Sequence, residues 1–358
     1  MKNKIEHRHG GDPEADFHRF GLPEKPVKDF SVNLNPLGPP GIILDQWMDL
    51  FGAVEGYPSV EGVGVAGYYK KRFGIPGENV LAANGSTEMI YLIPRVLRFK
   101  KVAIVTPSFH DYERASLAAG AEVSTVPLSM ANDFELPALT KIAEILRHND
   151  AVWIGRPNNP TGGLFLKEHI LELAEMFPEK WFIVDEAFIQ FVEDWEEKTL
   201  LKGNCLPNIL VLHSLTKFYA LAGLRIGALI GDKELIARLR KNKEPWTVNG
   251  IADRVAPLLS DCEGYEQQTM SLVSRERVRI YRQLYKLTRV RPFPSTVNFF
   301  LCQWKGSEDL DDLIRHLLEN GIYIRDCRNF TGLERGFFRF GIRSVEDNDR
   351  LLGLLAGI

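Results

Sequence analysis

One lysine in this sequence lies between two segments that are predicted to be buried, where a positive charge is unfavourable. Lys217 belongs to the run Ser214-Leu215-Thr216-Lys217, which lies between two apolar segments, 209–212 and 226–230. Short apolar segments of this kind are typical of buried strands. Removing an ammonium group from water is costly and lowers its pKa, so a buried lysine needs a chemical reason. The ordinary alternative is a lysine at a strand end whose amine extends to solvent.

Covalent chemistry would supply that reason. A lysine ε-amine condenses with an aldehyde to an imine, which attaches a carbonyl cofactor to the protein. The hydroxyls of Ser214 and Thr216 can donate to an anion, and Arg225, eight residues after the lysine, can bind phosphate oxygens with two parallel hydrogen bonds. An imine-forming lysine beside a phosphate site predicts pyridoxal 5'-phosphate as the cofactor.

A second phosphate-binding element is expected at Gly85-Ser86-Thr87, which follows the apolar run 80–83 and opens a helical pattern over 88–97. The free backbone amides and the positive dipole end of a helix N-terminus bind anions. Serine and threonine are also ordinary helix caps. The motif therefore indicates a phosphate-binding element only together with the phosphate site beside Lys217.

Two further strand ends carry groups that suit a pyridine ring. Asp185 follows the apolar run 181–184, and its carboxylate can pair with a ring nitrogen and keep that nitrogen protonated. The alternative is that Asp185 caps a following helix and that Glu186 is its exposed neighbour. Phe109 follows the apolar run 102–105, where its ring can stack on a flat heterocycle, although most phenylalanines only fill a core.

The segment Arg156-Pro157-Asn158-Asn159-Pro160-Thr161-Gly162-Gly163 follows another apolar run. Its prolines restrict the backbone on both sides of the asparagine pair, so Asn159 can direct an amide toward the ring oxygen of the cofactor or toward a carboxylate. A plain turn is the alternative, because Asn-Pro and Gly are also common in turns.

Nearer the C-terminus, Arg325 and Arg339 are each embedded among apolar strand residues. Buried guanidinium groups bind planar anions. One arginine on a carboxylate and the other on a phosphate would define an amino-acid phosphate ester as the substrate. Either arginine alone also fits the surface end of a strand.

The composition limits the class of protein. The chain has 358 residues, 45% of them apolar, a net charge of −3 and four scattered cysteines without metal-ligand spacing. These values are typical of an enzyme with two closely associated domains, and they predict no metal, no nucleic-acid partner and a reducing, cytoplasmic location. The first nine residues lack the apolar core of a secretory signal, and no apolar run is long enough to span a membrane.

The order of apolar runs predicts the fold. An α/β fold is indicated, with a seven-stranded, mostly parallel sheet flanked by helices, because helical patterns separate seven β-branched runs: 80–83, 102–105, 122–126, 151–154, 181–184, 209–212 and 226–230. Ligands of such sheets gather at the carboxyl ends of the strands. We expect a large cofactor-binding domain over 41–245 and a smaller α+β domain over 246–358.

The first forty residues, rich in glycine and proline, are expected to be a loop-like arm that lies with the small domain and the active site. They contain His9-Gly10-Gly11-Asp12 and the run Asn33-Leu34-Asn35-Pro36-Leu37-Gly38. If the second run were buried, its polar groups would need a ligand or a neighbour. Composition alone favours a solvated arm.

Taken together, these motifs resemble the class I and II aminotransferases, which are pyridoxal-phosphate-dependent enzymes of fold type I, over almost the whole chain. The resemblance rests on 85–87, Phe109, 157–162, Asp185, 214–217, Arg225 and Arg339. Within the family, the segments 9–11, 33–38, 185–188, 324–330 and 338–340 are most similar to the threonine-phosphate decarboxylases of cobalamin synthesis, and next to the histidinol-phosphate aminotransferases.

The resemblance also implies roles for further residues. It implies a homodimer with shared active sites, in which Tyr57 reaches the cofactor phosphate of the neighbouring subunit. It places Arg339 and Asn159 on the substrate carboxylate. Around the substrate phosphate it places His9, Asn33, Gly38 and Arg325. With Lys217 and Asp185 as catalytic residues, the implied reaction is the decarboxylation of L-threonine O-3-phosphate to (R)-1-aminopropan-2-yl phosphate.

Four positions depart from the pattern of the family. They are Phe188, where the aminotransferases usually have tyrosine, Arg156, where asparagine is commoner, Asp12, where the decarboxylases tend to have asparagine, and Ser59, where aspartate is usual. Phe188 weakens the case for an aminotransferase. A histidinol-phosphate or related aminotransferase, a phosphoserine decarboxylase and a non-catalytic, cofactor-binding regulator remain as alternatives.

Overall fold

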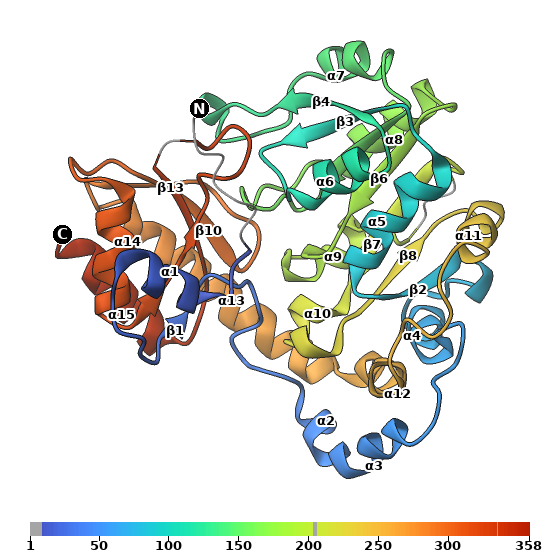
Figure 1. The fold of residues 1–358 in the computed structure, drawn as a ribbon, viewed down its shortest axis with the longest axis horizontal. Coiled ribbons are helices and arrows are strands. Elements are labelled where there is room, and N and C mark those ends of the chain that lie inside the picture. Colours follow the sequence, from blue (N-terminus) through green and yellow to red (C-terminus); the bar gives the residue numbers. More distant parts are fainter. Residues whose placement is uncertain (1–8, 203–205, 335) are drawn as a thin grey trace.

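The computed structural model describes residues 9–202, 206–334 and 336–358. The first eight residues of the predicted arm and Cys205 lie outside this described part. A larger body is built on a seven-stranded sheet and a smaller one on a four-stranded sheet (Figure 1). In the described part, no helix is both long and apolar enough to cross a membrane.

The large sheet has the seven strands that the sequence predicts. They are β2 (Val80–Asn84), β3 (Lys101–Thr106), β4 (Glu122–Pro127), β5 (Ala151–Gly155), β6 (Trp181–Asp185), β7 (Ile209–Ser214) and β8 (Ile226–Ile230), in the order β2-β8-β7-β6-β5-β3-β4. Strand β8 is antiparallel to β2 and β7, and the other neighbours are parallel. The predicted fold class, a mostly parallel α/β sheet, is confirmed.

Helices cover both faces of this sheet, which is why its strands read as continuous apolar runs. Successive side chains of a strand point to opposite faces, so Leu81 and Ala83 join one core cluster while Val80 and Ala82 join the other. The first cluster includes side chains of α5 (Ser86–Leu97), α6 (Asp111–Ala118) and α11 (Lys233–Arg240). The second includes those of α4 (Val63–Phe73), α7 (Leu139–Leu146), α8 (Lys167–Met176) and α12 (Gly250–Leu258).

Shorter helices complete the larger body. They are α2 (Gly41–Asp45), α3 (Trp47–Phe51), α9 (Trp195–Lys198) and α10 (Leu215–Phe218). Helix α10 follows β7 directly and carries Lys217, so the lysine lies just beyond the carboxyl end of a central strand.

The smaller body contains an antiparallel sheet in the order β12-β13-β10-β9. Its strands are β9 (Val290–Pro292), β10 (Phe299–Trp304), β12 (Arg325–Asp326) and β13 (Phe337–Gly341). Its helices are α13 (Glu263–Leu284), α14 (Leu310–Glu319) and α15 (Val345–Ala356). Strand pairing puts Arg325 opposite Arg339, so the two predicted anion-binding arginines lie on neighbouring strands.

The N-terminal arm is more ordered than its composition predicts. Helix α1 (Pro13–Phe20) begins where the Asp12 side chain accepts a hydrogen bond from the Ala15 amide, and it ends at Gly21 with a left-handed φ of 64°. Asp12 can cap this helix as well as the expected asparagine would. Strand β1 (Lys28–Asp29) then pairs in parallel with β11 (Ile322–Tyr323). Figure 1 shows the arm beside elements from the other end of the chain.

The segment 29–38, which we call the strap, continues from β1 toward the large sheet. Its Asn33 and Asn35 are buried, so the prediction of a solvated arm is wrong for this segment. Buried irregular backbone needs partners, and the small domain supplies them. Arg343 donates to the carbonyl oxygens of Asp29, Val32 and Leu34 at 2.8, 2.6 and 3.1 Å.

Candidate active site

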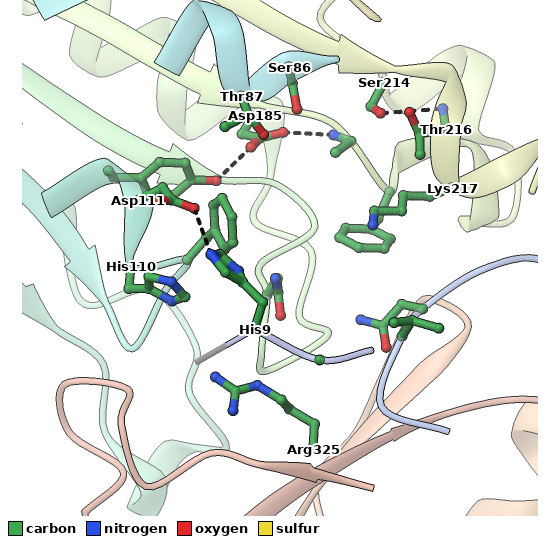
Figure 2. Close-up of a pocket in the computed structure, with 18 of the residues that line it drawn as sticks. His9, Ser86, Thr87, His110, Asp111, Asp185, Ser214, Thr216, Lys217 and Arg325 are labelled. Carbon is green, nitrogen blue, oxygen red and sulfur yellow. Dashed lines mark hydrogen bonds and ion pairs between the residues drawn. The ribbon is translucent and has the colours of Figure 1, made fainter. Parts of the chain in front are cut away.

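A pocket of about 490 Å³ opens at the carboxyl ends of the large sheet's strands (Figure 2). We call one side the strand-end half, formed by Ser86, Thr87, Phe109, Asp185, Ser214, Thr216, Lys217 and Arg225. We call the other side the arm half, formed by His9, Asn33, Asn159, Arg325 and Arg339. The fold thus brings together thirteen of the sixteen predicted site residues, and Gly38, Tyr57 and Gly85 do not line the pocket.

Lys217 projects into the pocket from α10. Its pKa is lowered to about 8, because burial disfavours the ammonium form and because Arg339 and Arg225 add positive charge; Asp185 opposes the shift. Within the described chain no hydrogen bond involves its Nζ atom. A lysine with such a pKa has a substantial fraction of neutral, nucleophilic amine near neutral pH.

Asp185 is the last residue of β6 and is buried. Its Oδ2 accepts a hydrogen bond from the Tyr112 hydroxyl at 2.7 Å, and its Oδ1 accepts one from the Ala187 amide at 2.9 Å (Figure 2). Burial raises the pKa of Asp185, while these two hydrogen bonds and Lys217 lower it. The carboxylate is therefore held in one orientation by two donors, and a cationic partner in the pocket would favour its charged form.

Glu186 is not the exposed neighbour that the capping alternative supposed, since it is completely buried. Its Oε1 pairs with Nη1 of Arg156 at 2.5 Å, and its Oε2 accepts from the Thr199 hydroxyl at 2.5 Å. Arg156 also donates to the carbonyl oxygens of Phe165 and Lys198, both at 2.7 Å. The arginine that departs from the family pattern thus neutralises a buried carboxylate next to Asp185.

The Gly85–Ser86 end of the strand-end half has the shape and donors of a phosphate site. Gly85 has a φ of 71°, and a Cβ atom there would lie 2.6 Å from the Arg225 guanidinium, so only glycine lets the arginine approach. Helix α5 begins at Ser86, which turns backbone amides and the positive dipole end toward the pocket. Together with the hydroxyls of Ser214 and Thr216, this donor set fits the phosphate of pyridoxal phosphate.

The arm half carries groups that suit a second set of anions. Arg339 donates from Nη1 to Oδ1 of Asn159 and from Nη2 to the carbonyl oxygen of Ser31 at 2.8 Å. Its buried Nε has no hydrogen-bond partner in the described chain, and burial lowers the pKa of Arg339 to about 10. A buried guanidinium with an unused donor favours a ligand carboxylate or phosphate.

Arg325 and His9 lie across the pocket from Asp185 and Lys217 in Figure 2. Arg325 is buried, and its Nη2 donates to Oδ1 of Asn329 at 2.8 Å. His9 Nε2 lies 3.8 Å from a carboxylate oxygen of Asp111. On the strap, the buried Oδ1 of Asn33 has no hydrogen-bond partner among the described residues.

Several residues that line the pocket were not predicted from the sequence, among them Tyr91, His110, Asp111, Tyr112 and Arg114. Tyr112 had only a weak signal, its position three residues after Phe109. Phe109 precedes α6, which begins at Asp111, and the two rings lie 5.7 Å apart. Atoms of metal-ligand type in His9, His110 and Asp111 lie within 4.8 Å of one another. The pocket also holds Arg325 and Arg339, which favours an anion there over a cation.

The remaining predicted residues lie elsewhere. Gly38 faces Tyr265, whose hydroxyl donates to the Gly38 carbonyl oxygen at 2.6 Å. Tyr57 is 88% exposed and its ring lies 5.2 Å from that of Trp246. Ser59, the fourth departure from the pattern, accepts from the Val63 amide at 2.9 Å and donates to Oδ2 of Asp253 at 2.7 Å, and an ionised aspartate could not donate this second hydrogen bond.

Comparison with known proteins identifies the family of this chain. A model of aminotransferase class I and II matches residues 55–355. The chain is 34% identical over 355 residues to the threonine-phosphate decarboxylase of Salmonella typhimurium, covering 98% of this chain and 96% of that protein. It is 28% identical to the adenosylcobalamin biosynthesis bifunctional protein CobDQ of Leptospira interrogans, covering 98% of this chain and 41% of that protein.

Among solved structures, the histidinol-phosphate aminotransferase of Clostridium acetobutylicum matches with a TM-score of 0.85 and 29% identity, covering 92% of this chain and 98% of that one. The chain belongs to the class I and II aminotransferase family. This confirms the predicted family resemblance. It also confirms the predicted class, a pyridoxal-phosphate-dependent enzyme, and so pyridoxal 5'-phosphate as the cofactor.

Proposed function

We propose that this enzyme decarboxylates L-threonine O-3-phosphate to (R)-1-aminopropan-2-yl phosphate, a step of cobalamin biosynthesis. The observation that carries the proposal is that one pocket offers two separate sets of anion-binding groups. The strand-end half has donors for the cofactor phosphate, and the arm half has Arg339 with Asn159, Arg325, His9 and Asn33. An amino-acid phosphate ester has the carboxylate and the phosphate that such an arm half would bind.

At the strand-end half, Lys217 would hold the cofactor and Phe109 would stack on its ring. Bound pyridoxal phosphate acts as an electron sink, which withdraws electrons from the bond at Cα that stands perpendicular to the ring. Asp185, with Tyr112 and the Ala187 amide on its two oxygens, would keep the ring nitrogen protonated. The phosphates of cofactor and substrate would thus bind at opposite sides of the pocket.

Orientation of the substrate would select the bond that breaks. His9, Asn33 and Arg325 would anchor the substrate phosphate, so the carboxylate near Arg339 and Asn159 is held out of the ring plane and leaves as CO₂. Lys217 would return a proton to Cα from its ε-ammonium group. Its pKa of about 8 suits this role, because a general acid works best when its pKa lies near the operating pH.

The test offers the purified, cofactor-loaded enzyme phosphothreonine, phosphoserine and histidinol phosphate, the last with 2-oxoglutarate. We expect CO₂ and aminopropanol phosphate from phosphothreonine, with no keto acid formed. The two phosphoamino acids differ by one methyl group, for which discrimination of about 1–3 kcal/mol is usual, so kcat/KM for phosphoserine should be about 10 to 200 times lower. Amino transfer from histidinol phosphate without release of CO₂ would overturn the proposal.

An aminotransferase is the second candidate, because the Clostridium acetobutylicum structure of that activity matches this fold at 29% identity. One residue argues against it. Phe188 lines the pocket with a ring that has no hydroxyl to bind the ring oxygen of the cofactor. Histidinol phosphate also lacks a carboxylate, so Arg339 and Asn159 would serve only its co-substrate.

A homodimer with shared active sites is part of the proposal. Large apolar side chains are exposed along one stretch of the larger body: Leu44, Trp47, Met48, Phe51, Val54, Tyr57, Val60 and Val63, with Trp246 nearby through its contact with Tyr57. An exposed apolar stretch of this kind supports a subunit interface on the larger body. Multi-angle light scattering should give twice the mass of one chain, and a monomer at working concentration would contradict the shared site. The cytoplasmic location stays a prediction.

A further inference from the structure

The helix that carries Lys217 cannot be stable by itself. Helix α10 has four residues, and a single turn is unfavourable because ordering its backbone costs more than its few hydrogen bonds return. The last four carbonyl groups of any helix have no partner inside the helix. Here the carbonyl of Leu215 accepts from the Tyr219 amide at 3.3 Å, and that of Thr216 from the Leu221 amide at 2.9 Å.

Asn35 of the strap donates to both of the remaining carbonyls, and the Phe218 carbonyl oxygen also accepts from the Tyr265 hydroxyl at 3.1 Å. The Asn35 amide donates to the carbonyl oxygen of Lys217 at 3.1 Å, shorter than the 3.4 Å bond to that oxygen from Ala220. The side-chain Nδ2 of Asn35 donates to the carbonyl oxygen of Phe218 at 2.7 Å. Asn35 is only 3% exposed, so these hydrogen bonds are shielded from competing water.

The side chain of Asn35 is itself held from both ends. Its Nδ2 also donates to the Thr269 hydroxyl oxygen on α13 at 2.7 Å, and its Oδ1 accepts from the Leu37 amide at 3.0 Å. The strap that carries it is attached to the small domain by Arg343 and by Asn298, whose Nδ2 lies 3.2 Å from the Asn33 carbonyl oxygen. Asn35 therefore joins three separate segments at the turn that carries Lys217.

We propose that Asn35 is a positioning residue that fixes the Lys217 turn and so holds the lysine side chain in the pocket. The inference rests on the function proposed above for Lys217. Asn33, two residues earlier on the strap, is a proposed ligand of the substrate phosphate. The same short segment therefore carries Asn33, which would bind the substrate, and Asn35, which would position the amine of Lys217.

Two substitutions separate the hydrogen bonds from packing. Asn35→Ala removes the side-chain donor, and Asn35→Asp keeps the shape but replaces the donor by an acceptor beside the Phe218 carbonyl. Asn208→Ala is the matched control, since Asn208 is also buried and its Nδ2 donates to the carbonyls of Ala174, Phe177 and Lys180 at 3.0, 3.1 and 3.1 Å, outside the pocket. All three variants should lose stability, so a fall in melting temperature alone decides nothing.

The first readout uses apoprotein without substrate: the pH dependence of acetylation of Lys217, followed by mass spectrometry of its peptide. In both Asn35 variants the midpoint should rise by at least one pH unit, because a frayed turn exposes the ammonium to water. Asn208→Ala should leave the midpoint unchanged. An unchanged midpoint in Asn35→Ala, or wild-type behaviour of Asn35→Asp, would overturn the inference.

The second readout is the turnover of phosphothreonine by cofactor-loaded enzyme. We expect kcat of both Asn35 variants to fall at least tenfold, with KM changed less than threefold. A raised KM with unchanged kcat would show that Asn35 serves the strap instead of the lysine, and would overturn the inference. If wild-type enzyme turned over no phosphorylated substrate, the proposed function would fail, while the acetylation midpoint would still decide the role of Asn35.

Discussion

The two halves of the pocket are assembled in different ways. In the strand-end half, Asp185 and Ser214 are the last residues of the neighbouring strands β6 and β7, and Lys217 follows three residues later. In the arm half, Arg339 of β13 donates to the Ser31 carbonyl oxygen of the strap, although the two residues are 308 positions apart.

The difference lies in what each half needs from the rest of the fold. Strand order brings the strand-end groups to one edge of the sheet, because parallel strands end at the same edge. The strap adds to this half the contact of Asn35 with the Lys217 turn. The arm half forms only when the strap, the small sheet and the loop after β5 that carries Asn159 come together. We therefore expect substitutions in the first half to affect chemistry and folding, and those in the second to affect mainly the binding of phosphorylated substrate.

The largest effect is expected at Lys217. Lys217→Ala should lower the rate of CO₂ release by at least about 10⁴-fold, because the variant loses both the amine that holds the cofactor and the general acid. Lys243→Ala is a fitting control, since that lysine is also buried but pairs with Glu88 at 3.4 Å and does not line the pocket. Activity near the wild-type level in Lys217→Ala would exclude the proposed chemistry of the strand-end half.

Substitution of Arg156 tests whether the strand-end half also depends on the buried ion pair between Arg156 and Glu186. Arg156→Asn should destabilise the protein by about 3–5 kcal/mol in urea unfolding, since Glu186 would be left buried without its cation. The double variant Arg156→Met, Glu186→Leu should recover most of this loss, because both charges are then absent. If the double variant were as unstable as the single one, lost packing, and not an unpaired charge, would explain the instability of Arg156→Asn.

In the arm half, Arg325→Ala should raise KM for phosphothreonine by about 10 to 100-fold, from the loss of about 1.5–3 kcal/mol in charge-assisted hydrogen bonds. Binding of unphosphorylated threonine, measured as competitive inhibition, should change less than threefold. An equal loss of binding for both ligands would show that Arg325 does not bind the substrate phosphate. The expectation that substitutions in the arm half affect mainly phosphorylated substrate would then be wrong.

The pH dependence of stability tests the lowered pKa of Lys217. The pKa of Lys217 is about 8 in the fold, below its ordinary 10.5, so between these values the unfolded chain binds more protons and apoprotein stability rises with pH. Apo Lys217→Met lacks this contribution. It should be more stable than wild type at pH 7, and the gap should narrow as pH rises from 8 to 10.5. A gap independent of pH in urea unfolding would contradict the lowered pKa.

The sequence alone determined the elements whose signals are local. Seven apolar runs gave the large sheet, because strands covered on both faces must be apolar throughout. The residues that follow those runs, Asp185, Lys217 and the Gly85 turn, were found because strand ends are recognisable from the chain itself. The same reasoning identified Arg325 and Arg339, since charged residues inside apolar strands stand out.

Only the tertiary structure decided how the strap is buried. Its glycines, prolines and asparagines predict a solvated loop, yet Arg343 and Asn298 satisfy its carbonyls and Asn35 binds the Lys217 turn. The same holds for Glu186, whose burial depends on a cation 30 residues away. Such contacts leave no pattern in the sequence, because whether a polar group is buried depends on partners that only the folded chain brings within hydrogen-bond distance.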